Sequence, residues 1–171
     1  MTGTTSGTVE LLASSNGADP APVAFTSVDG SGDASFTVKP TEKTTYFAQL
    51  QAGSKYASSS SSAVTVDVAP RLSVTARPLK AKSSRHSLDA VALTGVIVPA
   101  RPAEPLIFSV ARRDRGTWVP LPNVTARIHS SGKARMIFRP RRKGAYRVEV
   151  AFNGDSRYRG WVSVWTRFNV R

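Results

Sequence analysis

The chain of 171 residues contains no cysteine and only two histidines. Without cysteine it can form no disulfide, no zinc–thiolate site and no cysteine nucleophile. No apolar run approaches the ~20 residues that a membrane-spanning helix needs. Residues 1–8 are small and polar and lack the basic and apolar regions of a secretory signal, so we expect any such signal to lie upstream or not to exist. The fold therefore has to be stable without covalent cross-links.

The sequence also lacks any combination of residues that is typical of a catalytic site. His86 and His129 have no acidic residue at a useful spacing, and we interpret both as surface or turn histidines. The sequence has no phosphate-binding loop and no nucleophile elbow. The turn Asp29-Gly-Ser-Gly-Asp33 offers too few carboxylates for calcium, which takes six or more oxygen ligands. We predict a protein that is not an enzyme and that uses no metal and no cofactor.

Acidic residues are scarce in the second part of the chain. Residues 1–69 hold three lysines and six acidic residues, a net charge of −3, whereas residues 70–171 hold 21 basic and five acidic residues, a net charge of +16. Seventeen of those 21 are arginine, whose planar guanidinium suits phosphate and carboxylate. Codon bias in a GC-rich genome would also enrich arginine, so composition leaves both explanations open.

One pattern occurs twice, one hundred residues apart. The first copy reads Gly32-x-Ala34-x-Phe36-x-Val38-x-Pro40 and then Tyr46; the second reads Gly132-x-Ala134-x-Met136-x-Phe138-x-Pro140 and then Tyr146. A turn glycine, an alternating apolar strand, a proline and a tyrosine that opens the next strand indicate two copies of one β unit. We predict an all-β chain with two tandem antiparallel β-sandwich domains, residues 1–69 and 70–171.

The two copies differ in completeness. The second is predicted to be a complete seven-stranded sandwich, because short strands follow one another with turn residues between them and without helical periodicity. The first contains only the later strands, which we expect at residues 8–12, 22–28, 34–38, 45–51 and 64–68. It lacks the first two strands, so it would expose core side chains and open edges. We expect upstream residues or another chain of an oligomer to complete it.

The residue order of the second copy resembles a known family. It runs Leu93-Thr-Gly95-Val96-x-Val98-Pro99, Gly116-Thr-Trp118, Gly132, Gly144-Ala-Tyr146-Arg147-Val148, Gly154-Asp155-x-x-Tyr158 and Ser163. This order resembles the bacterial immunoglobulin-like repeats of exported, cell-surface and phage virion proteins, over nearly all of residues 71–171 and less fully over 8–69. The resemblance implies immunoglobulin-like sandwiches that act as spacers, adhesins or virion decorations. The first copy has no tryptophan equivalent to Trp118, so we expect a thinner core there.

In immunoglobulin order, the turns after strands one, three and five of the second copy would lie at one end. Ten cations fall on these turns: Lys80, Lys82, Arg85, Arg112, Arg113, Arg115, Arg139, Arg141, Arg142 and Lys143. Clustered cations raise the local potential by several kT and attract polyanions. This end is a candidate site for nucleic acid, teichoic-type polymer, acidic glycan or an acidic protein face. The alternative is a solvated end without a ligand.

Two tryptophans of the last strand form a second candidate surface. Trp161 and Trp165 share one strand face with Ser163 and Arg167. We assign the opposite face to the core: Val162, Val164, Phe168 and Val170. Two outward indoles about 13 Å apart, with Tyr158 nearby, could stack on sugar rings or contact a subunit. In the inverted register the tryptophans would fill the core. Trp118 is expected to pack in the core or at its edge.

The features together favour a non-catalytic structural or adhesion module of an exported, cell-surface or virion assembly. Such a module would space and contact neighbouring chains and an anionic surface. One alternative is a carbohydrate-binding module that uses the exposed tryptophans and Tyr158. Another is a nucleic-acid-binding protein, which the acidic first copy disfavours.

Overall fold

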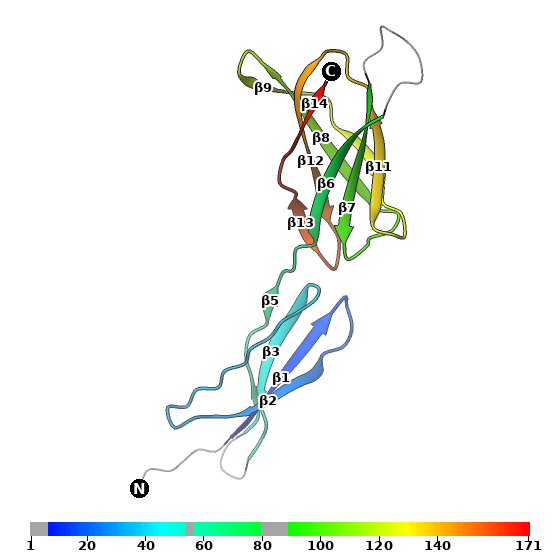
Figure 1. The fold of residues 1–171 in the computed structure, drawn as a ribbon. Coiled ribbons are helices and arrows are strands. Elements are labelled where there is room, and N and C mark those ends of the chain that lie inside the picture. The colour runs from blue at the N-terminus through cyan, green and yellow to red at the C-terminus, as the bar shows by residue number, and fades with distance from the viewer. Residues whose placement is uncertain (1–6, 54–56, 80–88) are drawn as a thin grey trace. The chain divides into compact units, whose positions relative to one another are not determined.

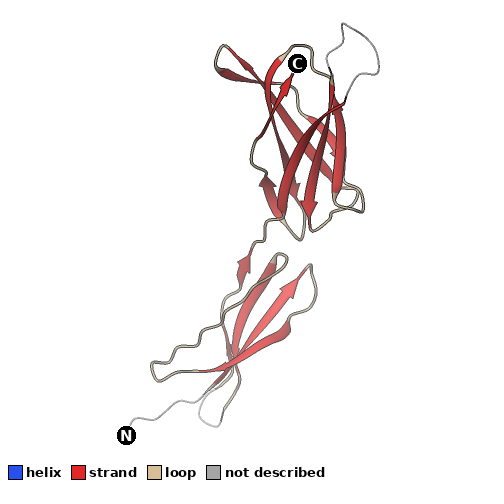
Figure 2. Ribbon diagram, in the orientation of Figure 1, coloured by secondary structure: helices blue, strands red, loops and turns tan. Residues whose placement is uncertain are grey.

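A computed structural model describes residues 7–53, 57–79 and 89–171, which form 14 β-strands and no helix (Figure 2). The strands pair in antiparallel sheets, so the predicted all-β class is confirmed. Contacts divide the chain into two compact units: Met1–Val68 with Asp155–Arg159, and Ala69–Gly154 with Gly160–Arg171. The described residues contain no helix that is long and apolar enough to cross a membrane.

The first unit contains one five-stranded sheet. Its strands are β1 (Thr8–Ser15), β2 (Ala21–Ser27), β3 (Thr44–Leu50), β4 (Ser59–Ser60) and β5 (Val64–Val66). The order is β2-β1-β3, and both β4 and β5 pair with β3. The β1–β2 hairpin turns at Asn16 and Gly17, which have φ angles of 53° and 77°. Asparagine followed by glycine favours such a turn because both tolerate positive φ.

Residues 34–38 were predicted to form a strand, and this prediction is wrong. Residues 33–40 belong to no strand, and among the described residues 34–40 make no backbone–backbone hydrogen bond. The segment still contributes Phe36 and Val38 to a hollow of about 270 Å³, which Leu11 and Tyr46 of the sheet also line. The alternating apolar pattern is present, but a strand needs a neighbour to pair with. No described strand of the first unit offers one.

The core of the first unit is thin. Its strands bury only Val9, Leu11 and Thr44. Phe25 and Val64 are 60% and 61% exposed. A single sheet with one partly covered face leaves apolar side chains in water, as expected for a sandwich that lacks strands.

The second unit contains two facing sheets (Figure 1). One has the order β11 (Lys133–Phe138), β7 (Ala90–Val98), β6 (Arg71–Leu79). The other has the order β10 (Val124–Arg127), β8 (Pro105–Asp114), β12 (Gly144–Gly154), β13 (Arg159–Val162), with β9 (Thr117–Pro120) paired to β8 and β14 (Thr166–Val170) paired to β12. These residues form nine strands rather than the predicted seven. The difference arises partly because the predicted last strand is broken into β13 and β14.

Alternate side chains of the facing strands fill the core of the second unit. Leu106 and Phe108 of β8 and Val148 and Val150 of β12 are fully buried. Gly95 of β7 faces this core, and a Cβ atom added there would clash with Leu106 Cδ2. The missing side chain at residue 95 therefore lets the two sheets pack closely.

Candidate anion-binding site

The arginine-rich end of the second unit is formed by two connections that lie at the same end, beside the C-terminus (Figure 1). The β8–β9 turn lies at Arg115 and Gly116, with φ angles of 47° and 90°. Arg112 and Arg113 were expected in this turn but lie on β8. Residues 139–143 connect β11 to β12. Lys80, Lys82, Arg85 and His86 lie outside the described residues.

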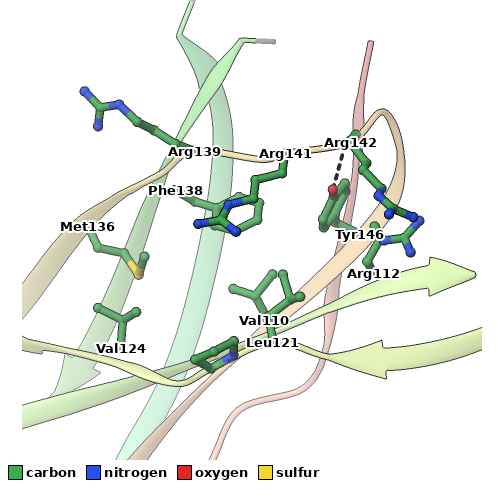
Figure 3. A pocket seen from close by; sticks show the side chains of 11 residues that line it. Val110, Arg112, Leu121, Val124, Met136, Phe138, Arg139, Arg141, Arg142 and Tyr146 are labelled. Carbon is green, nitrogen blue, oxygen red and sulfur yellow. Dashed lines mark hydrogen bonds between the residues drawn. The ribbon is translucent and has the colours of Figure 1, made fainter. Parts of the chain in front are cut away.

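Four of the other seven predicted cations line one pocket of about 470 Å³, which we call the arginine pocket (Figure 3). These are Arg112, Arg139, Arg141 and Arg142. The remaining lining is apolar or aromatic: Val110, Leu121, Pro122, Val124, Met136, Phe138 and Tyr146. Arg113, Arg115 and Lys143 do not line it. The sandwich thus brings together arginines that lie about 30 residues apart in the sequence.

The arginines are arranged around the mouth of the pocket. Arg141 reaches across the opening in front of Phe138 (Figure 3). Arg142 and Arg112 point to the side of Tyr146, whereas Arg139 points away from the pocket. The charges of Arg112, Arg141 and Arg142 therefore lie at the rim, and the apolar side chains form the interior.

Tyr146 fixes one wall of the pocket and the connection that carries the arginines. Its side chain is buried, and its hydroxyl donates a 2.6 Å hydrogen bond to the carbonyl oxygen of Arg142. Its ring lies 5.5 Å from that of Phe138 and 5.6 Å from that of Phe168. Burial raises the pKa of Tyr146, and the positive charges of Arg112 and Arg142 partly offset this rise. The tyrosine therefore stays neutral and holds the start of β12 against the core.

The positive charge of the arginine pocket is only partly compensated. Arg112 forms a 3.0 Å salt bridge with Asp114. In the described part of the chain, no carboxylate lines the pocket or pairs with Arg139, Arg141 or Arg142. Guanidinium groups without a carboxylate partner are suited to bind phosphate, sulfate or carboxylate groups from outside.

The second candidate surface differs from the prediction at its central residues. Val162 and Val164 were assigned to the core, but both are exposed, Val164 by 83%. Ser163, expected on the outer face, is buried: its backbone N–H donates to the Val150 carbonyl oxygen, and its Oγ accepts from the Val150 N–H. The strand ends at Val162 and begins again at Thr166. The alternation of faces is lost at this break.

The tryptophans are only partly available to a ligand. Trp161 is 45% exposed and Trp165 is 37% exposed. The Arg147 Cζ atom lies 4.1 Å from the ring centroid of Trp165 and 4.8 Å from that of Trp118, so the guanidinium covers one face of each ring. Tyr158, expected to be a contact residue, is buried, and its backbone N–H donates a 2.8 Å hydrogen bond to the Asp155 carboxylate. This arrangement weakens the carbohydrate hypothesis.

Arg147 was not predicted to belong to this surface. Its guanidinium lies between two tryptophans, and Arg167 Cζ lies 6.0 Å from the Trp118 ring. The Arg147 Nε atom is buried without a hydrogen-bond partner in the described structure. Cation–π attraction to two rings contributes stability here. The sequence does contain a signal for this role. Arg147 lies between the core residues Tyr146 and Val148, so alternation along the strand places its side chain on the outer face, where the tryptophans lie.

The aspartate turn of the first unit is organised by its own backbone. One Asp29 carboxylate oxygen accepts hydrogen bonds from the N–H groups of Asp33 and Ser31, which lowers the Asp29 pKa. The described residues contain no group of three or more acidic or histidine side chains that could hold a metal ion. The carboxylate therefore acts as a turn cap.

No protein-family model matches the chain, and no curated protein sequence is significantly similar to it.

Proposed function

We propose that this chain is a non-catalytic contact module whose second unit binds an anionic polymer through its arginine-rich end. The observation that carries the proposal is the grouping of Arg112, Arg139, Arg141 and Arg142 around one pocket without a carboxylate in its lining. The net charge of +16 on residues 70–171 would also steer a polyanion toward this unit.

We further propose an immunoglobulin-like topology for both units. The Tyr146 hydroxyl bonds to the backbone four residues upstream, at the corner where immunoglobulin-like sandwiches carry such a tyrosine. The strand order β2-β1-β3-β5 of the first unit recurs as β9-β8-β12-β14 in the second. The recurrence supports a duplicated unit.

The first unit is proposed to contact a neighbouring chain through its incompletely covered sheet. The exposed Phe25 and Val64 and the unpaired segment 34–38 support this contact. The resemblance to bacterial immunoglobulin-like repeats supports a place in an exported, cell-surface or virion assembly.

The polymer-binding proposal is tested with fluorescently labelled polyphosphate. We compare the full chain with two charge-matched triple variants. The first is Arg139→Ala, Arg141→Ala, Arg142→Ala; the second is Arg71→Ala, Arg127→Ala, Arg135→Ala, which removes exposed arginines elsewhere on the second unit. We expect the first to lose about tenfold or more in affinity. Equal losses in both variants would contradict a specific site.

A further inference from the structure

We infer that the arginine pocket binds a small amphipathic anion, a molecule with an apolar body and one anionic head group. This inference rests on the proposed anion preference of the same end and adds a ligand class to it. A polymer of charged groups has no apolar part that could enter the interior of the pocket. An amphipathic anion uses both the interior and the rim.

The interior has the size and chemistry of a small-molecule site. Its volume of about 470 Å³ lies within the range of roughly 300–1,000 Å³ that is usual for such sites. Val110 and Leu121 form one side, and Val124 and Met136 lie on the other (Figure 3). Apolar groups that enter this space leave water, which favours binding in proportion to the area buried.

The polar groups of the pocket select the head group. Arg141 crosses the mouth, and Arg112 and Arg142 lie beside Tyr146 (Figure 3). A phosphate, sulfate or carboxylate at the mouth can accept charge-assisted hydrogen bonds from these guanidinium groups. The Tyr146 hydroxyl already donates to the Arg142 carbonyl oxygen. The interior therefore offers little to the many hydroxyls of a neutral sugar, which need hydrogen-bond partners when they are buried.

The test uses isothermal titration calorimetry of the full chain with three probes. Octyl phosphate carries both parts of the proposed ligand, inorganic phosphate carries only the head, and octanol carries only the apolar body. We expect octyl phosphate to bind at least about tenfold more tightly than either matched probe. Equal affinity for octyl phosphate and inorganic phosphate, or for octyl phosphate and octanol, overturns the inference.

Three variants locate the site. Val124→Trp fills the interior from a half-exposed strand position without changing the charge, and Arg141→Ala removes one guanidinium from the mouth. Each should lower the affinity for octyl phosphate about tenfold or more. Arg115→Ala removes an arginine at the same end that does not line the pocket, and it should leave this affinity unchanged. Equal effects of all three variants would overturn the inference.

Polyphosphate separates this inference from the proposed function. Val124→Trp should retain polyphosphate binding, because the rim arginines remain. A chain that binds polyphosphate but not octyl phosphate overturns the inference and leaves the proposed function intact. A chain that binds neither overturns both.

Discussion

At the scale of single residues, Gly95 shows how closely the two sheets of the second unit pack. An added Cβ would clash with Leu106 Cδ2 and would lie 3.1 Å from Val150 Cγ1 and 3.2 Å from Phe108 Cζ. All three neighbours are buried, so they have little room to move. The sequence marks residue 95 only as a glycine inside a β-branched run. The close approach becomes visible only when the opposite sheet is present.

We predict that Gly95→Ala lowers the free energy of unfolding of the second unit by about 1–3 kcal/mol, because the added methyl group overpacks the core. Urea unfolding followed by tryptophan fluorescence measures this, since all three tryptophans lie in the second unit. With Leu106→Ala as background, the cost of Gly95→Ala should be smaller. An unchanged unfolding midpoint for Gly95→Ala would contradict the packing described here.

Glu149 provides a prediction of pH dependence. Burial raises its pKa, and the nearby charge of Arg147 offsets this only in part. The folded state therefore binds the proton more tightly than the unfolded state, and the stability that this gives is lost as the pH rises through the folded-state pKa. We expect Glu149→Gln to be more stable than the natural chain at pH 7, and the difference to vanish below the ordinary glutamate pKa. Urea unfolding midpoints of both proteins, at pH 7 and at a pH below the ordinary glutamate pKa, measure this difference in stability. A natural chain more stable than Glu149→Gln at pH 7 would refute the expectation.

At the scale of elements, residues 34–38 and 133–138 carry the same alternation but have different structures. The second segment is β11, which pairs with β7 along its whole length. The first has no such neighbour among the described strands. Sequence alternation predicts which side chains face the core, but pairing depends on a partner that can be far away in the chain or absent. The strands predicted at residues 8–12, 22–28, 45–51 and 64–68 are therefore present as β1, β2, β3 and β5, whereas residues 34–38 form none because they have no partner strand among the described residues.

Amide hydrogen exchange tests this difference within one molecule. We expect the amides of residues 134–138 that donate to β7 to be strongly protected and those of residues 34–38 to exchange rapidly, because exposed unpaired amides open at almost no cost in free energy. Residue-resolved NMR exchange rates at a single pH give both values. Similar protection of the two segments would show that the first unit contains a pairing strand after all.

The last strand shows a second limit of sequence patterns. The alternation in residues 161–170 predicted one continuous strand, yet the buried Ser163 interrupts it by making hydrogen bonds to both the N–H and the carbonyl of Val150. Phe168 and Val170, after the break, face inward as predicted. Alternation of apolar and polar residues predicts which face a side chain takes only within one continuous strand. A serine in the sequence does not by itself indicate that the strand is interrupted.

At the scale of the whole molecule, charge is the property that the sequence predicts well. The net charges of −3 and +16 on the two parts follow from composition, and strand order brings the turn arginines to one end. The arginine pocket was not predictable. It depends on where Leu121, Val124 and Met136 leave a gap between the sheets, and each of these looks like an ordinary core residue in the sequence.

The salt dependence of polyphosphate binding shows whether the arginines of the β11–β12 connection bind the polymer. If Arg139, Arg141 and Arg142 contact the polymer, each contributes to the counterion release that makes affinity fall with salt. The slope of log affinity against log salt should then become shallower by about one for each contacting arginine removed. We expect this shallower slope for the triple variant Arg139→Ala, Arg141→Ala, Arg142→Ala and not for Arg71→Ala, Arg127→Ala, Arg135→Ala. Identical slopes for the natural chain and the first variant would contradict it.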